Sequence, residues 1–145
     1  MLIGAKFMIT DLLLDTCTAI WMTENMPLAR DATEAIDNSF RKGMNIYLSP
    51  ITAWERGVLV AKGRMSSLIT PQLWFRRLSG VEGFALADLT PDILIESSFL
   101  PGEIHNDPAD RILIATARAH DLTVVTRDRK ILDYAEQGHV RALKC

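Results

Sequence analysis

Four acidic residues in separate segments of this 145-residue chain have the types and positions that a carboxylate-based active site needs. Asp15 and Asp128 each follow a short apolar run of strand type. Glu55 and Asp110 lie early in segments with a helical pattern. In an open parallel sheet, sites form where strands end and the next helices begin. The four carboxylates are therefore expected to converge on one pocket.

A cluster of like charges needs a counterion. Two carboxylates about 4 Å apart repel each other by roughly 4 kcal/mol at an effective dielectric constant of 20. Oxygen ligands without cysteine or histidine favour magnesium or manganese over zinc. Two such ions about 3.5–4 Å apart can activate a water and stabilise the leaving oxygen of a phosphodiester. The residue types thus predict metal-assisted hydrolysis of nucleic acid.

Each carboxylate also has a purely structural interpretation. Asp110 would complement the helix dipole, Asp15 would start a turn, and Asp128 would cap the helix that follows it. Glu55 is different, because it lies within a predicted apolar stripe, where an ionised side chain is rarely buried without a partner. That stripe consists of Ile51, Trp54, Val58 and Leu59.

The stretch 106–134 carries two of the four acids, Asp110 and Asp128. It is predicted to form a helix, a tight turn, a strand at 123–125 and the start of a second helix. Asp107 is the expected N-cap, and Pro108 suits the first turn. The expected buried face consists of Leu113, Ile114, Ala115, Ala117, Ala119 and Leu122. Helical spacing places Asp110 in line with this face.

Short apolar strands alternate with amphipathic helices along the whole chain. This alternation predicts an α/β fold with helices on both faces of a parallel sheet. The expected strands are 12–14, 46–48, 84–86, 123–125 and, at an edge, 140–143. The other expected helices are 17–23, 27–42, 49–63, 70–79, 90–100 and 131–136. Neither a repeat nor an interdomain linker is evident, which predicts a single domain.

The composition is that of an ordinary globular protein, with 48% hydrophobic and 23% charged residues. A net charge of −2 carries no global basic signature, so contact with nucleic acid must rely on a local patch or on bound metal ions. The three histidines have no ligand spacing.

The two cysteines, Cys17 and Cys145, are far apart in sequence, which favours reduced thiols in the cytoplasm over a disulfide framework or a zinc site. The apolar start, residues 1–10, is too short for a membrane span and does not resemble a signal peptide. No membrane association is therefore expected.

Four segments together resemble the PIN-domain family, and most of all its bacterial VapC-type toxins. They are LLLDT at 12–16, SPITAWERGVLVAKGR at 49–64, DPADRILIATARAHDLTVVTRD at 107–128 and ILDY at 131–134. The resemblance implies a three-layer α/β/α sandwich, with a mostly parallel central sheet of four to five short strands, as one PIN-like domain over residues 1–145. It also implies a magnesium- or manganese-dependent ribonuclease, usually homodimeric, that a small antitoxin protein inhibits.

The resemblance also assigns roles to the acids. Asp15 and Asp110 would be the firmest metal ligands, and Glu55 would assist them. Asp128 would help to hold a second ion or its water. Asp107 matches the acid that opens the helix and is not expected to be a ligand. The ten residues before the first strand depart from the family pattern.

Several arginines are candidates for contacts with RNA phosphates. Of these, Arg111 and Arg127 are preferred, although helical spacing also places Arg111 on a solvated face with Arg118. Trp54 and Trp74 are expected in the core or at a dimer contact. The candidate arginines are Arg64, Arg76, Arg77, Arg111, Arg127 and Arg129.

Two other functions are compatible with an acidic site of this kind. A receiver-type signalling domain also binds magnesium at strand ends, but Asp11 and Asp15 are too far apart for its acid pair, and Lys130 matches its lysine only loosely. A PIN-like module that binds RNA or a partner without cleavage would have no need to maintain mutually repelling carboxylates.

Overall fold

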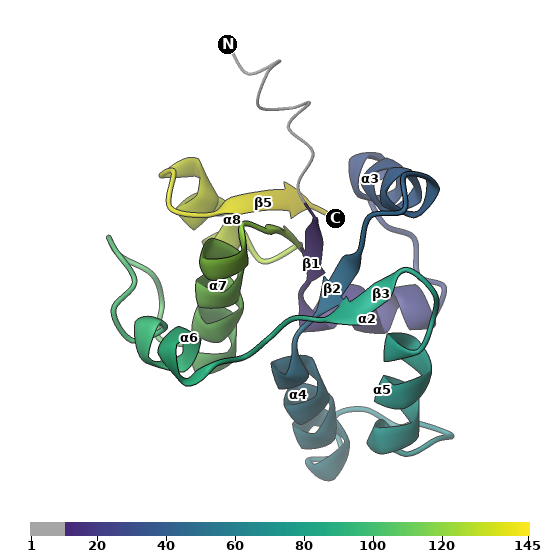
Figure 1. Ribbon diagram of the computed structural model, residues 1–145. Helices are drawn as coiled ribbons and strands as arrows, with labels where there is room; N and C mark the ends of the chain where they lie inside the picture. Colours follow the sequence, from purple (N-terminus) through teal and green to yellow (C-terminus); the bar gives the residue numbers. More distant parts are fainter. Residues whose placement is uncertain (1–10) are drawn as a thin grey trace.

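The computed structural model describes residues 11–145, in which five strands form one sheet with the order β3-β2-β1-β4-β5 (Figure 1). Every neighbouring pair of strands runs parallel. The central strand β1 pairs with β2 on one side and with β4 on the other, so the strand order reverses at β1 and β4. The strands are β1 Leu12–Leu14, β2 Ile46–Leu48, β3 Phe84–Leu86, β4 Thr123–Thr126 and β5 Arg141–Lys144.

Two apolar clusters pack on opposite faces of the sheet, because successive side chains of a strand point to opposite sides. Leu12 and Leu14 pack with residues of α2, α3 and α5, whereas Leu13 packs with residues of α7 and α8. Figure 1 shows these two groups of helices on either side of the strands. The helices are α2 Thr16–Thr23, α3 Arg30–Arg41, α4 Pro50–Ala61, α5 Pro71–Ser79, α6 Pro91–Glu96, α7 Pro108–His120 and α8 Arg129–Glu136.

The predicted α/β/α architecture with a parallel sheet is therefore confirmed. The expected edge strand is β5, and it pairs with β4 in parallel. The single domain over residues 1–145 stays a prediction, since residues 1–10 lie outside the described residues. Within the described part of the chain, no helix is both long and apolar enough to cross a membrane.

The α7 helix begins where the sequence predicts, whereas the ends of some other helices differ from the prediction. Asp107 accepts a hydrogen bond from the Asp110 amide, as expected of the α7 N-cap. Two helices are shorter than predicted: α3 begins only at Arg30, without a side-chain cap, and α6 already ends at Glu96. The predicted buried face of α7 is correct except for Ala119, which is exposed.

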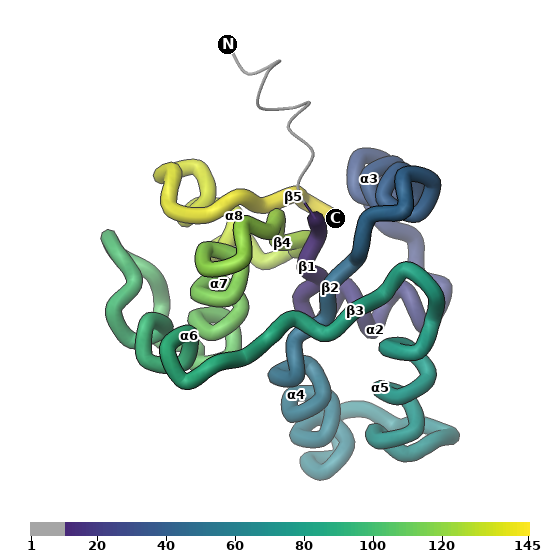
Figure 2. Tube along the Cα trace, viewed as in Figure 1, coloured from purple at the N-terminus to yellow at the C-terminus, as the bar shows by residue number. Residues whose placement is uncertain are grey.

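The chain trace in Figure 2 brings β4 beside β1, although more than a hundred residues separate them in sequence. Leu13 pairs with Val124 in this register, and the Asp15 amide donates to the Val125 carbonyl at 3.1 Å. The carboxyl ends of β1 and β4 therefore lie next to each other, at the position where the strand order reverses.

Truncation of Leu13 tests the central packing. Leu13→Ala removes a side chain with no exposed surface, and we expect it to lower the free energy of unfolding by about 2–5 kcal/mol. The matched control, Leu68→Ala, removes a fully exposed leucine and should change this free energy by less than about 0.5 kcal/mol. Urea unfolding followed by circular dichroism measures both, and equal effects would contradict the packing described here.

Candidate active site

A pocket of about 260 Å³ opens at the carboxyl ends of β1 and β4. All four acids expected to converge line this pocket, and they come from four different elements or their caps. The complete lining is Asp15, Thr16, Cys17, Trp21, Glu55, Asp110, Arg127 and Asp128. The fold thus brings the predicted carboxylates together, whereas their roles as ligands or catalytic groups stay predictions.

Asp15 is the most deeply placed of the acids, with 7% of its surface exposed. One carboxylate oxygen accepts a hydrogen bond from the Thr18 amide at 2.8 Å, which caps α2. The other accepts from the hydroxyl of Thr126, at the end of β4. The backbone of β1 and two neutral donors therefore hold this carboxylate in one orientation.

Glu55 reaches the pocket from α4, where its Oε1 accepts a hydrogen bond from the Thr16 hydroxyl. The predicted apolar stripe around it is wrong at Trp54, which is 59% exposed, whereas Ile51 and Leu59 are partly buried and pack against the two core clusters. The buried residues of α4 are Thr52 and Arg56. Thr52 also lies 3.1 Å from the Thr16 hydroxyl. Glu55 is partly buried, and the hydroxyl pair Thr16 and Thr52 gives it a polar partner at the pocket.

Asp128 is an N-cap, so its structural interpretation is correct without excluding another role. Its Oδ1 accepts from the amides of Lys130 and Ile131, at 2.8 and 3.3 Å. Its own amide donates to the Thr126 hydroxyl at 3.0 Å. Since both cap bonds use Oδ1, the second oxygen is not needed for the cap.

His105 is a site residue that the sequence did not single out. Its Nε2 lies 2.7 Å from Asp110 Oδ2. Ligand atoms of His105, Asp110 and Asp128 lie within 4.8 Å of one another, close enough to share a metal ion. Asp15 and Glu55 line the acidic pocket with Asp110 and Asp128 but are not part of this close group, whereas His105 belongs to the group without lining that pocket. The histidine has no paired spacing; only its position just before the cap of α7 could have drawn attention to it.

Burial in the pocket raises the pKa values of Asp15, Glu55 and Asp110 above the ordinary range for carboxyls, and neighbouring acids raise them further. Folding therefore favours the protonated forms. The folded protein without a cation loses stability as the pH rises from the ordinary pKa to the raised one. A divalent cation would remove this penalty, and a donor set of carboxylate oxygens fits such an ion.

The model of the PIN domain family matches residues 12–137, which is most of the chain. The chain belongs to the PIN domain family. This confirms the family expected from the sequence, and the matched residues contain the four acids and His105.

Relatives of this PIN domain are similar over nearly their whole length. Ribonuclease VapC22 of Mycobacterium tuberculosis is 29% identical over 123 residues, which is 84% of this chain and 90% of that protein. A toxin–antitoxin complex from Klebsiella pneumoniae has a chain that is 27% identical, with a TM-score of 0.55, over 83% of this chain and 88% of its own.

A more distant structure shares the fold. VapBC2 from Rickettsia felis, solved with a DNA fragment from its promoter, has a TM-score of 0.65 at 16% identity, over 92% of this chain and 97% of its own.

The two preferred arginines occupy different environments in this PIN domain. Arg127 lines the acidic pocket, where its guanidinium lies 4.0 Å from the centre of the Trp21 ring and donates to the Cys145 carbonyl at 2.9 Å. Arg111 is not on a solvated face as predicted. It is partly buried and donates to the backbone carbonyls of three residues, namely Ser97, Ile104 and His105. Arg127 is thus the better candidate for contact with RNA.

The tryptophans also differ from expectation in part. Trp74 is buried, as predicted, and its indole nitrogen donates to the Thr23 hydroxyl at 3.0 Å. Trp54 is exposed and does not belong to the core, so only its proposed role at a dimer contact stays open.

The thiol of Cys17 reports on the charge of the pocket. Burial, followed by the charges of the four acids, raises its pKa from 9.0 to about 11. We expect its alkylation by iodoacetamide to rise with a midpoint close to pH 11. Glu55→Gln removes one of the charges and should lower this midpoint. Mass spectrometry of the Cys17 peptide separates this reaction from that of Cys145. A midpoint near pH 9 in both proteins would contradict the charge cluster.

Proposed function

We propose that this protein is a metal-dependent endoribonuclease that acts as the toxin of a toxin–antitoxin pair. The observation that carries this proposal is the convergence of Asp15, Glu55, Asp110 and Asp128 on one partly buried pocket. Family membership and the similarity to a protein named as a ribonuclease support it. A module that only binds RNA or a partner would not need to keep carboxylates whose pKa values burial has raised.

Within this proposal, the four acids hold Mg²⁺ or Mn²⁺. A divalent cation bound there would supply Lewis-acid stabilisation of the charge that develops on the phosphodiester. The residues of the chain orient the ligands beforehand: Thr126 and the Thr18 amide hold Asp15, and Thr16 holds Glu55. These donors are neutral, so they fix the carboxylates without replacing the cation.

Arg127 and Trp21 provide the features that suit a nucleic acid next to this pocket. The guanidinium lies at the pocket wall, where a phosphate of single-stranded RNA would meet a positive charge. Trp21 is partly buried beneath it and supports the arginine through a cation–π contact. This local cation compensates for the negative net charge of the chain.

The partner chains of the similar structures support an antitoxin as partner of this protein.

We propose, in addition, a homodimer, for which exposed apolar side chains such as Trp54, Ile95 and Phe99 supply contact area. A single-chain mass in light scattering at roughly 100 μM would exclude a dimer with a dissociation constant of about 1 μM or tighter. Both cysteines are free thiols, which agrees with a cytoplasmic location.

The central prediction concerns Asp110→Asn. Without this carboxylate the cation is held less tightly, and we expect RNA cleavage to fall by about 100-fold or more while the fold persists. Cleavage should also stop with a chelator and return with Mg²⁺ or Mn²⁺. A gel assay with a fluorescent single-stranded RNA measures both effects.

The matched control is Asp92→Asn, which also neutralises an acid in the first turn of a helix, but on the exposed α6. It should cleave like the unchanged protein. Full cleavage by Asp110→Asn, or in the presence of chelator, would exclude the proposed mechanism and leave binding without cleavage as the remaining function.

A second prediction concerns Arg127→Gln, measured in the Asp110→Asn background to prevent cleavage. Loss of one phosphate contact should weaken RNA binding, and the slope of log K against log salt should become shallower by about 0.7. Fluorescence anisotropy at several salt concentrations gives this slope. Arg30→Gln, on an exposed face of α3, is the control. An unchanged slope in Arg127→Gln would place the phosphate contact elsewhere.

A further inference from the structure

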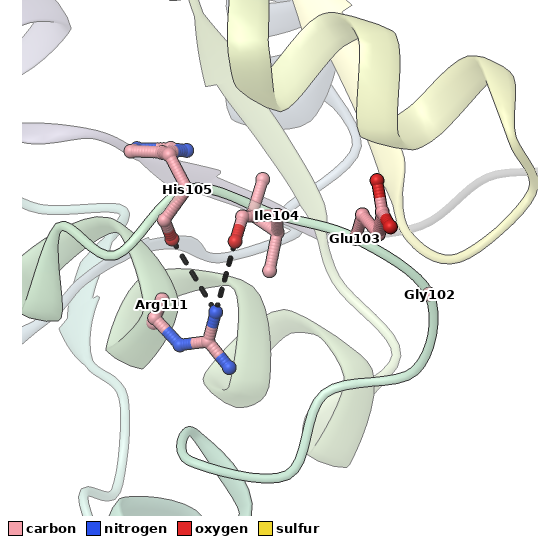
Figure 3. A pocket seen from close by; sticks show the side chains of 5 residues that line it. All are labelled: Gly102, Glu103, Ile104, His105 and Arg111. Atoms are coloured by element: carbon pink, nitrogen blue, oxygen red, sulfur yellow. Dashed lines mark hydrogen bonds between the residues drawn. The ribbon is translucent and has the colours of Figure 1, made fainter.

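His105 and Arg111 form a support next to the acidic pocket, on the side of a second, larger pocket of about 510 Å³. Figure 3 shows both side chains at this second pocket, which Gly102, Glu103 and Ile104 also line. His105 belongs to the segment between α6 and α7, and Arg111 follows Asp110 in α7. The two residues therefore connect a loop to the helix that carries one of the proposed ligands.

Arg111 fixes the backbone of this loop. Its NH1 donates to the carbonyls of Ile104 and His105, at 3.2 and 3.3 Å, as the dashed lines in Figure 3 indicate. Its Nε donates to the carbonyl of Ser97 at 2.8 Å. One guanidinium thus holds carbonyls from the end of α6 and from the loop. Such a clamp restricts where the His105 ring can lie.

The partners of the two ring nitrogens determine the proton position in His105. Nε2 lies 2.7 Å from Asp110 Oδ2, whereas Nδ1 is buried and has no hydrogen-bond partner within residues 11–145. A proton on Nδ1 alone would leave two lone pairs facing each other across 2.7 Å. A proton on Nε2 instead makes a charge-assisted hydrogen bond to the carboxylate. The geometry therefore favours the tautomer that donates to Asp110.

The same geometry disfavours His105 as a metal ligand. A ligating imidazole must present a bare nitrogen to the ion, and it usually donates its other N–H to a carbonyl or carboxylate. Here coordination through Nε2 would move the proton to Nδ1, where the described residues offer no acceptor. Proximity to Asp110 and Asp128 is thus better explained by a supporting contact than by coordination.

We propose that His105, clamped by Arg111, is a positioning residue for Asp110. Its Nε2–H binds Oδ2 and leaves Oδ1, together with the second lone pair of Oδ2, for a divalent cation. This inference rests on the proposed function in that Asp110 is taken as a cation ligand. Residues that orient a ligand in this way typically account for 10- to 100-fold in metal affinity.

The test is the affinity for Mn²⁺, measured by electron paramagnetic resonance on the full chain without RNA. His105→Ala should weaken Mn²⁺ binding by about 10- to 100-fold. His105→Gln places an amide donor near the position of Nε2 and should recover most of the affinity. His120→Ala is the control, because the His120 ring lies 3.1 Å from the Asp88 carbonyl on an exposed surface and does not line the acidic pocket. Thermal unfolding without metal verifies that each variant is folded.

Two spectroscopic measurements separate positioning from coordination. Nitrogen-15 chemical shifts should show His105 protonated at Nε2 in the metal-free protein. Pulsed electron paramagnetic resonance should show no imidazole nitrogen coupled to bound Mn²⁺. A nitrogen coupling that disappears in His105→Ala would make His105 a ligand and overturn the proposal. Unchanged Mn²⁺ affinity in folded His105→Ala would overturn it as well.

The clamp has its own test. Arg111→Lys cannot hold the same set of carbonyls and should weaken Mn²⁺ binding in the unchanged background. In the His105→Ala background, Arg111→Lys should weaken Mn²⁺ binding by less than about a further twofold, because Arg111 acts through His105. Independent, additive losses would show that Arg111 does not act through the histidine.

These outcomes are distinct from failure of the proposed function. If the protein binds Mn²⁺ but does not cleave RNA, the ribonuclease proposal fails. The order of Mn²⁺ affinities expected for the His105 variants still tests the positioning role. If it cleaves RNA and all His105 variants bind Mn²⁺ equally, only the positioning role fails.

Discussion

The mutual repulsion of carboxylates in a partly buried pocket is the constraint on which the rest of this structure depends. Asp15, Glu55 and Asp110 all lose hydration on folding, and each adds to the negative field of the pocket. Packing elsewhere must provide the free energy that keeps these groups together. The sheet does so through the buried contacts of β1 and β4, which are followed directly by the pocket residues Asp15 and Arg127.

The protein restrains these carboxylates with neutral donors. Threonine hydroxyls and backbone amides bind Asp15, Glu55 and Asp128, and none of these three has an ion pair with lysine or arginine among residues 11–145. Of the nearby arginines, Arg127 lies on Trp21 at the pocket wall and Arg111 binds backbone carbonyls, and neither has an ion pair with these carboxylates among residues 11–145. The pocket is therefore ordered and still negative, which is the condition for taking up a cation from solution.

Much of the fold could be predicted because local signals and the overall architecture agree. Alternating apolar strands and capped helices indicated a parallel sheet, and Asp107 with Pro108 marked the start of α7 correctly. The exposure of Trp54 and the role of Arg111 could not be predicted from helical spacing. Spacing defines the faces of a helix, but which face is covered depends on the neighbours of that helix. In α4 the covered face contains Thr52, which is buried, whereas Trp54 lies on an exposed face.

The sequence by itself determined which residues are carboxylates, which elements carry them and that these elements end at one edge of a sheet. It did so because strand and helix periodicity, caps and prolines are local properties of the chain. Only the tertiary structure decided that His105 lies against Asp110 and that Arg111 holds the loop between α6 and α7. It also decided that Thr16 and Thr126 orient Glu55 and Asp15. These contacts join side chains from different elements, and their distances depend on how the elements pack in three dimensions.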